Sequence, residues 1–472
     1  MSEWKKYGGA WKLFENETPY NGELHINEDM RIIRLEILIP AIGTNPLPCI
    51  AYKGYLPYIC GTLFSGAKVL LYNCHTGNES NYVCQYTQQI IHAQYAFWGL
   101  QVDNEEDLRF NKALFCLNAP LRWFDLCHYE YQYHDDDHGA DLIWRKDESV
   151  SIDYKDDLKM TFIPQQEVKG INYYENNIEM AQNVWIKFEY ANETTWEMMI
   201  SDIASVQQLI ELGCSKKIQI LKAKFYHKSV YIDASGQEFP CVGSVAIGDA
   251  KRVKKNSGRD YFDYAFSFKE FATNEAILTN WKNNFQKLRP ILDLYETMYT
   301  DVGTATTLFL NLTQALETFH ARFISDDYST YKEKVDKLLK DSASEAMWRE
   351  CLLNENGNRK KIYLLNRISF LVLAEWELPV GFLESNPVIF CQKIVDSRNY
   401  YTHYNLKKKE SAYRVEELPL VNAYLGFLLQ YHVLTLLGFD KGKIKSTIEK
   451  KLNLVETNHS LQTKTQPISR KN

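Results

Sequence analysis

The chain has 472 residues, of which 45% are hydrophobic, and its 54 Lys and Arg against 60 Asp and Glu leave a net charge of −6. This length exceeds what one hydrophobic core usually organises, and the composition excludes a disordered chain, so we expect two folded domains. Ten cysteines without a Cys-x-x-Cys pair argue against a zinc ribbon or knuckle. The opening Met-Ser-Glu-Trp-Lys-Lys is not apolar, so we expect no signal peptide, a cytoplasmic location and reduced thiols.

Residues 1–272 predict a β-rich domain. Segments rich in Val, Ile, Tyr and Phe, separated by turn residues, occur at 30–40, 68–73, 82–101, 149–164, 184–190 and 217–225. In this part only residues 201–212 have convincing helical periodicity. A β-sandwich or a barrel-like sheet with long loops fits this pattern best.

One loop in this domain offers metal-ligand chemistry. His134 and His138 enclose three consecutive aspartates, and His128 and Asp141 lie nearby in the sequence. Two imidazoles at helical spacing with carboxylates suit a divalent metal. Nothing else supports a helix here, and three aspartates followed by Gly139 are typical of a hydrated loop. We therefore predict no metal site, with a metallo-hydrolase loop as an alternative that sensitivity to chelators would reveal.

Helical patterns take over after residue 272. Residues 273–300 predict a connecting helix, and residues 301–455 predict an all-α bundle with helices at 304–323, 361–375, 388–404, 420–439 and 441–453. The segment 420–439 is almost wholly apolar, but Asn422, Gln430 and His432 interrupt it. We interpret it as the middle of a bundle or a dimer seam, and predict no membrane span. The polar residues 456–472 predict a disordered tail.

The sequence SRNYYTH at 397–403 carries the strongest functional signal. Asn386 and Pro387 are good residues to start the helix that contains it. At about 100° per residue, Arg398, Asn399 and His403 fall within an arc of about 140°, so all three can face one cleft. This arrangement suggests that the protein cleaves RNA.

The residue types suit a phosphodiester cut that needs no metal. An imidazole can take the proton of a ribose 2′-hydroxyl or give one to the leaving 5′-oxygen. Arg398 supplies fixed positive charge with bidentate geometry for a phosphate, and Asn399 can orient the phosphate or the imidazole. The chain has no glycine-rich phosphate loop and no Walker-type lysine, so we predict no nucleotide hydrolysis and no cofactor.

Spacing alone is weak evidence for this site. Arginine followed four to six residues later by histidine also occurs from Arg122 to His128, in a strand-rich region without a helical stripe. The helical context favours the pair Arg398 and His403.

These residues resemble the HEPN superfamily of helical-bundle ribonucleases, in its Apea-like branch. The resemblance rests on SRNYYTHY at 397–404 and on the earlier helix with Gln-Ala-Leu-Glu at 314–317. The first half of the chain resembles the matching ApeA N-terminal domain. Its signs are Gly8-Gly9-Ala10-Trp11, Gly22-Glu23-Leu24, Ile59-Cys60-Gly61-Thr62, Ser65-Gly66, Phe97-Trp98-Gly99, Phe110 and residues 121–124. The two resemblances cover most of the chain in the family's order.

The resemblance implies roles for individual residues. Arg398 and His403 correspond to the catalytic pair, Asn399 to the polar residue after the arginine, and Glu317 and Tyr401 to supporting residues. It implies that the protein cleaves an RNA, either a tRNA or an mRNA, without a metal ion. This cleavage leaves a 2′,3′-cyclic phosphate and a 5′-hydroxyl. It also implies a homodimer through the helical domain and a role in abortive anti-phage defence. The N-terminal domain would then sense a phage-derived trigger or restrain the nuclease.

The charge is divided unevenly along the chain. Residues 1–300 carry 30 Lys and Arg against 40 Asp and Glu, or −10, whereas residues 301–472 carry 24 against 20, or +4. Lys407, Lys408 and Lys409 directly follow the motif and are predicted to contact the RNA backbone. The alternative function is a non-catalytic HEPN scaffold that only binds RNA or protein. Such a scaffold would bind RNA equally well without His403.

Overall fold

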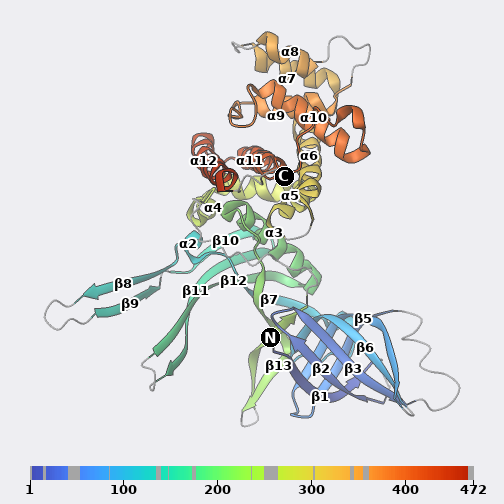
Figure 1. The fold of residues 1–472 in the computed structure, drawn as a ribbon. Helices are drawn as coiled ribbons and strands as arrows, with labels where there is room; N and C mark the ends of the chain where they lie inside the picture. The colour runs from blue at the N-terminus through green and yellow to red at the C-terminus, as the bar shows by residue number, and fades with distance from the viewer. Residues whose placement is uncertain are drawn as a thin grey trace. The chain divides into compact units, whose positions relative to one another are not determined.

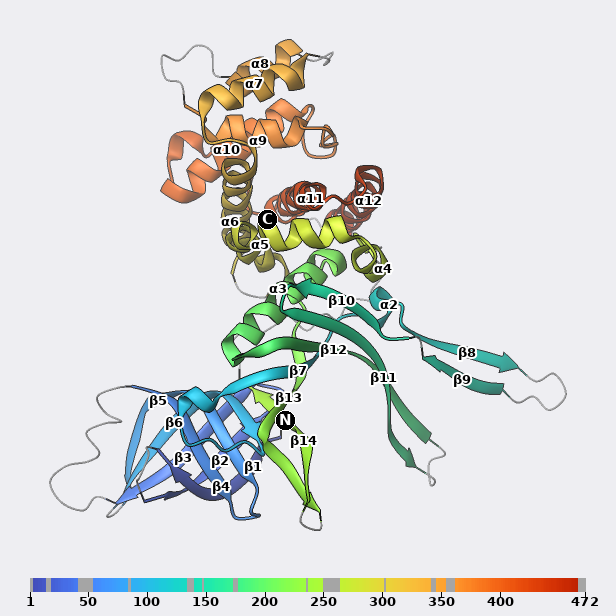
Figure 2. The same ribbon diagram turned by 180° about the vertical axis from the view of Figure 1, so that it is seen from behind.

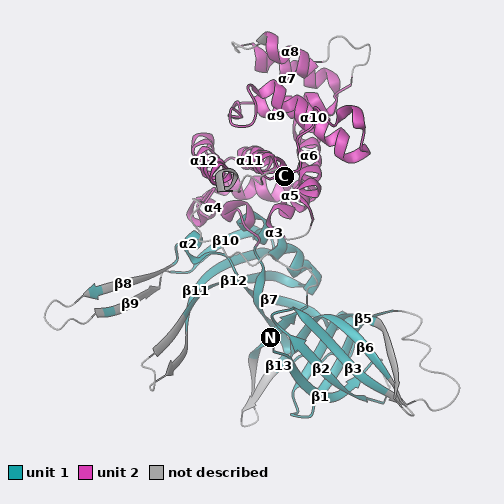
Figure 3. Ribbon diagram, viewed as in Figure 1, with its two compact units in different colours: residues 1–210, 218–252 teal, residues 211–217, 253–472 magenta. Residues whose placement is uncertain are grey.

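The computed structural model divides the chain into two compact units, which are described separately (Figure 3). Unit 1 comprises residues 1–210 and 218–252, and unit 2 comprises residues 211–217 and 253–472. Unit 1 is built mainly of strands and unit 2 of helices, which confirms the predicted α+β class (Figures 1 and 2). The residues that the structure describes are 3–13, 18–40, 54–83, 86–133, 140–146, 148–172, 177–234, 237–248, 264–300, 303–340, 345–353 and 361–465.

Six strands of unit 1 close into a barrel. They are β1 (Lys5–Lys12), β2 (Tyr20–Asn27), β3 (Ile32–Pro40), β4 (Tyr55–Leu63), β5 (Lys68–Val83) and β6 (Tyr86–Trp98). They pair in the order β6-β3-β2-β1-β4-β5, and β5 pairs back with β6 (Figure 1). From the sequence, both a sandwich and a barrel were possible. The pairing of β5 with β6 shows that this part is a barrel, in which closure removes the free edges of the sheet.

The barrel is filled by alternate side chains of its strands. Trp11, Leu24 and Leu35 are fully buried in one apolar cluster with residues of all six strands. The inward-facing Trp11 ring explains Gly61, because a Cβ on that glycine would lie 2.3 Å from the ring. Gly61, one of the glycines in the N-terminal motifs, is therefore needed to make room for the Trp11 ring in the core.

The sheet continues beyond the barrel. From β6 it extends in the order β14 (Gln237–Ile247), β13 (Ile220–Ala234), β7 (Arg109–Leu117), β12 (Asn177–Thr195), β11 (Leu158–Asn172) and β10 (Val150–Lys155). Helix α3 (Trp196–Cys214) begins with a buried indole that lies edge-on to Phe97 and Phe110, with ring centroids 4.9 Å and 5.7 Å away. Strands β8 (Cys127–Tyr133) and β9 (Ala140–Lys146) form a separate hairpin.

Some expectations for unit 1 were wrong in detail. The stretch 149–164, predicted as one strand, contains β10 and the start of β11, because the turn at Asp156 and Asp157 reverses the chain. Arg122, in the part of the chain described from the sequence as strand-rich, lies on the four-residue helix α2 (Leu121–Phe124). The loop from His134 to His138 lies outside the described residues.

Unit 2 is a helical bundle. Its helices are α4 (Phe268–Ala272), α5 (Glu275–Tyr295), α6 (Ala305–Phe319), α7 (Tyr328–Leu339), α8 (Glu345–Leu353), α9 (Leu364–Leu373), α10 (Pro387–His403), α11 (Leu418–Leu437) and α12 (Lys441–Thr465). Shorter turns are η2 (Glu296–Tyr299), η3 (His320–Ile324) and η4 (Leu406–Lys408). Helix α5 packs on α6 and α11, so residues 273–300 belong to the bundle instead of merely connecting two domains.

Helix α11 forms the centre of the bundle. It is long and apolar enough to cross a membrane, yet 78% of its most hydrophobic stretch is buried inside the structure. It packs on α5, α6, α9 and α12, as the interpretation of residues 420–439 as a core helix required. Helix α12 runs to Thr465, so residues 456–465 are helical and the prediction of a disordered tail from 456 was wrong there. The Tyr424 hydroxyl of α11 donates to the Glu456 carboxylate, and the His459 ring lies edge-on to Phe382, so other parts of the bundle support the start of this polar stretch.

Candidate active site

Helix α10 positions the Arg-Asn…His motif. The Asn386 side chain accepts a hydrogen bond from the Ile389 backbone N–H at 2.9 Å, and Pro387 occupies the first turn. The helix ends where Tyr404 adopts a left-handed conformation with φ of 48°. Both ends therefore agree with the helix predicted at 388–404.

One stripe of α10 faces the bundle core. Phe390, Ile394, Ser397 and Tyr401 are buried and recur at the spacing of one helix face. The motif arc is centred about 130° away from this stripe at 100° per residue. Half-buried Val395 lies at the centre of that arc.

The motif residues differ in exposure. Arg398 and Asn399 are half-buried, whereas His403 is exposed. The Arg398 guanidinium donates to the Asn399 side-chain oxygen at 3.4 Å, which is a long hydrogen bond. Five residues separate Arg398 from His403 by about 7.5 Å along the helix and about 140° around it. In the described part of one chain, no hydrogen bond joins the two.

The two supporting residues have different surroundings. The Tyr401 hydroxyl donates to the Tyr413 carbonyl at 2.7 Å, and its ring lies edge-on to Phe309 with centroids 6.2 Å apart. Burial raises the pKa of Tyr401. Tyr401 is therefore a structural anchor of the motif helix. Glu317 is half-buried on α6, which packs against α10, and among the described residues its side chain has no hydrogen-bond or ion-pair partner.

The lysines after the motif are not equivalent. Lys407 and Lys409 are exposed, but the Lys408 ammonium forms an ion pair with Asp396 at 2.7 Å. Asp396 is only 6% exposed, so this pair ties η4 to α10. Of the three lysines predicted to contact RNA, Lys408 is thus held by the protein itself.

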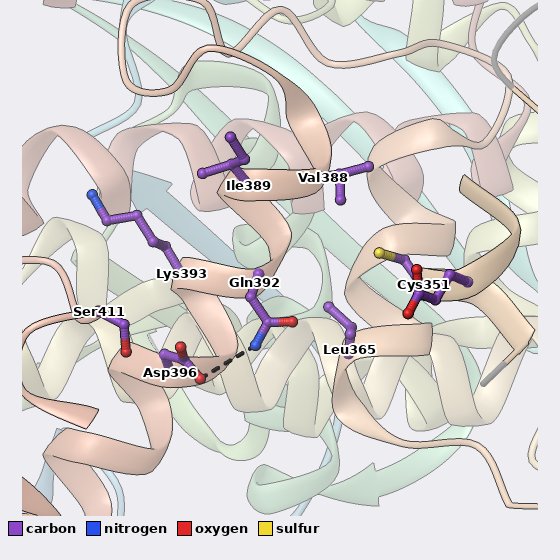
Figure 4. Close-up of a pocket in the computed structure, with 9 residues that line it drawn as sticks. Cys351, Leu365, Val388, Ile389, Gln392, Lys393, Asp396 and Ser411 are labelled. Carbon is purple, nitrogen blue, oxygen red and sulfur yellow. Dashed lines mark hydrogen bonds between the residues drawn. The ribbon is translucent and has the colours of Figure 1, made fainter. Parts of the chain in front are cut away.

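A cavity of about 540 Å³ lies beside α10 and was not predicted from the sequence (Figure 4). Its walls come from α8, α9, α10 and the segment after η4, which are far apart in the chain. It is lined by Glu350, Cys351, Leu365, Val388, Ile389, Gln392, Lys393, Asp396 and Ser411. The signal in the sequence that could have pointed to this cavity was Asp396, a carboxylate directly before the motif. In the structure its side chain is buried.

A second buried polar cluster was also missed. His320, in the π-helical turn η3, is fully buried, and its Nδ1 lies 3.2 Å from the Arg367 guanidinium. Arg367 in turn forms an ion pair with Asp326 at 2.6 Å. Burial, together with the nearby Arg367 charge, lowers the pKa of His320 to about 3, so the imidazole is neutral and accepts a hydrogen bond from the guanidinium. This cluster stabilises the junction of α6 and α9.

The ranges of the chain that the structure describes contain no candidate metal site. In those ranges no group of three His, Cys, Asp or Glu side chains is placed to hold a metal ion. His128 and Asp141 lie on β8 and β9, and their predicted companions His134 and His138 lie outside the described residues.

Comparisons with known proteins extend the evidence from geometry. The family model for the ApeA N-terminal domain 1 matches residues 6–281, and the model for the Apea-like HEPN domain matches residues 310–443. No curated protein and no solved structure matches the chain. The first match covers more than half of the chain, and the second contains most of α6, all of α10 and the whole motif. The chain therefore belongs to the ApeA-type HEPN family of anti-phage defence proteins.

Proposed function

We propose that this protein is a metal-independent endoribonuclease whose catalytic residues are Arg398 and His403, assisted by Asn399. The observation that carries the proposal is that all three lie outside the buried stripe of one helix, with Arg398 and Asn399 half-buried and His403 exposed. A fixed cation and an imidazole on an accessible face suit a phosphodiester substrate. The match of residues 310–443 to a family that generally has ribonuclease activity supports the same conclusion.

The proposed reaction is attack of a ribose 2′-oxygen on the adjacent phosphorus. An imidazole takes the 2′-hydroxyl proton as the bond from O2′ to phosphorus forms. A protonated imidazole gives a proton to O5′ as the bond from phosphorus to O5′ breaks. The products are a 2′,3′-cyclic phosphate and a 5′-hydroxyl, with no net proton consumed. Arg398 stabilises the negative charge that grows on the phosphate, and Asn399 orients it.

Two copies of the chain are proposed to build the active site. A single α10 offers only one motif imidazole, His403, which would have to act as both base and acid. A two-fold symmetric pair of α10 helices would place each arginine beside the histidine of the other copy and would supply two imidazoles, one as base and one as acid. Val395, half-buried at the centre of the motif arc, offers apolar surface for this pairing.

The remaining parts of the proposal concern substrate and control. Exposed Lys407 and Lys409 lie next to the motif and are placed to contact the phosphates of a tRNA or mRNA. An unrestrained ribonuclease would poison its host, so we assign to the N-terminal domain the restraint of the nuclease and its release by a phage-derived trigger in the cytoplasm.

The test compares induced cells that carry the wild type, Arg398→Ala, His403→Ala and His75→Ala, an exposed histidine of unit 1. RNA ends are sequenced before and after phage infection. New cyclic-phosphate ends in the wild type and His75→Ala, and none in the other two, are expected. Protection by all four without new ends would overturn catalysis and support the binding scaffold instead.

A further inference from the structure

The cavity beside α10 has a chemistry that the proposed cleavage reaction does not use. We propose that it is a subsite that binds a guanine base of single-stranded RNA near the cleaved bond, and so determines where the substrate is cut. This inference rests on the proposed ribonuclease function for its substrate, but its own evidence is the arrangement of atoms around the cavity.

The cavity has the size and walls of a small-molecule site. Its volume of about 540 Å³ lies within the range usual for ligand pockets. Leu365 and Val388 supply apolar surface, on which the flat face of a base can pack (Figure 4). A phosphate would find little to bind here, because the most buried polar side chain of the lining is a carboxylate.

The Asp396 and Gln392 side chains turn hydrogen-bond acceptors toward the cavity. The Gln392 amide nitrogen donates to Asp396 Oδ1 at 3.3 Å, and the Lys408 ammonium donates to the same oxygen at 2.7 Å. These bonds leave Asp396 Oδ2 and Gln392 Oε1 as the atoms open to a ligand. In Figure 4 the Gln392 oxygen points toward Leu365 and Cys351, across the cavity from its bond to Asp396.

The donors of the other polar lining residues are directed at the protein itself. The Lys393 ammonium is held by Glu384 at 2.8 Å and lies over the Tyr413 ring, 4.4 Å from its centroid. The Ser411 hydroxyl donates to the Lys408 carbonyl at 3.2 Å. Glu350 contributes another carboxylate. The open acceptors Asp396 Oδ2 and Gln392 Oε1 therefore favour a ligand that donates hydrogen bonds.

Guanine is the base that meets this requirement. Its Watson–Crick edge presents two adjacent donors, N1–H and the N2 amino group, and the cavity offers two open acceptors for them, Asp396 Oδ2 and Gln392 Oε1. Adenine and cytosine present one amino donor beside an acceptor, and uracil presents one donor between two acceptors. Single-stranded RNA exposes these edges for recognition.

The cavity also lies on the correct side of α10. Asp396 precedes His403 by seven residues, which is about 10 Å along the axis and only about 20° around it. Gln392 and Asn399 have the same spacing. A stacked strand advances about 3.4 Å per nucleotide, so an RNA at His403 reaches the cavity within about three nucleotides.

The test measures binding of short fluorescent RNAs to the full chain carrying His403→Ala, which prevents cleavage. A polyuridine with one guanosine should bind roughly tenfold more tightly than the same RNA with adenosine, as one bidentate base contact provides. Asp396→Asn should abolish the difference. Gln392→Leu, which leaves the ion pair of Asp396 and Lys408 intact, should reduce it. Glu410→Gln, an exposed carboxylate in the same segment, is the matched control and should keep it.

Sequencing of cleavage sites made by the wild type separates this inference from the proposed function. Guanine at a constant position within about three nucleotides of the cut is expected. Cleavage without guanine enrichment, together with equal binding of the two RNAs, would overturn the subsite and leave the nuclease intact. Guanine-dependent binding without any cleavage would uphold the subsite and overturn the nuclease. Competition by agmatine as strong as by guanosine would overturn the guanine assignment in favour of a guanidinium-bearing protein partner.

Discussion

The Ser397 hydroxyl accepts a hydrogen bond from the Tyr413 backbone N–H at 2.8 Å, and both residues are buried. One turn later on α10, Tyr401 donates to the carbonyl of the same Tyr413. The residue directly before Arg398 thus binds the chain segment that returns from η4. The position of the motif is therefore maintained by a contact between neighbouring segments and not by the helix alone.

Replacement of Ser397 tests this contact. Ser397→Ala leaves a buried N–H without an acceptor, so the free energy of unfolding of the helical unit should fall by about 1–3 kcal/mol. Urea denaturation followed by far-UV circular dichroism measures it. Thr402→Ala, an exposed site on the same helix, should change it by less than about 0.5 kcal/mol. Equal effects of the two substitutions would contradict the anchoring role.

The cleavage rate should depend on the planar shape of the Arg398 guanidinium as well as on its charge. Arg398→Ala should lower the cleavage rate of purified protein by at least about 100-fold, as loss of a transition-state donor does. Arg398→Lys keeps the charge but loses the planar fork, and should recover only part of the rate. Full activity of the lysine variant would show that bidentate contact is not needed.

Tyr401→Phe should reduce stability more than activity, since its hydroxyl is engaged with Tyr413.

Pairing of the motif helices predicts that one apolar position controls both assembly and activity. Val395→Asp places a charge at the centre of the motif arc, so it should convert a dimer into a monomer and abolish cleavage. Light scattering coupled to size-exclusion chromatography measures the mass. Leu454→Asp, at a 45% exposed position of α12, is the control that should remain dimeric and active. A fully active Val395→Asp monomer would refute the shared site.

The two lysines beside each other should behave differently toward RNA. Lys407→Ala removes an exposed charge and should lower the slope of log affinity against log salt by about 0.7, the value of one phosphate contact on single-stranded RNA. Lys408→Ala instead leaves buried Asp396 without its ion-pair partner, so it should mainly reduce stability. Salt titrations of RNA binding and urea denaturation distinguish these effects, and the reverse pattern would contradict the assignment.

Two buried histidines predict loss of stability in mild acid. Burial lowers the pKa of His320 to about 3 and the pKa of His432 to about 4, whereas in the unfolded chain both titrate near about 6.5. Their folded-state pKa values are depressed, so the stability they support is complete above about pH 6.5. Below that pH the unfolded chain takes up protons first. Each histidine then lowers the free energy of unfolding by about 1.4 kcal/mol per pH unit.

Urea denaturation at about pH 7.5 and about pH 5.5 measures this dependence. His320→Gln and His432→Gln should each be less stable at the higher pH and lose less on acidification. His403→Gln, at an exposed position, should retain the wild-type dependence. An unchanged dependence in both buried variants would show that other groups cause the acid sensitivity.

Local patterns were sufficient for many elements. Helix α10 was predicted because Asn386 and Pro387 act within one turn, and α11 because a continuous apolar segment has to be covered. The sequence predicted a sandwich or a barrel-like sheet without deciding between them, because closure of the barrel depends on the pairing of β5 with β6. The helical end of α12 was missed because its stability comes from contact with α11.

The sequence by itself determined the order of a β-rich part and a helical part, the motif and the helix that carries it, since these depend on neighbours within a few turns. Only the tertiary structure decided which face of α10 is buried, that Tyr401 and Lys408 are held by Tyr413 and Asp396, and that four separate segments enclose a cavity of acceptor atoms. Those outcomes depend on which distant segments meet, and burial and hydrogen-bond partners exist only once they do.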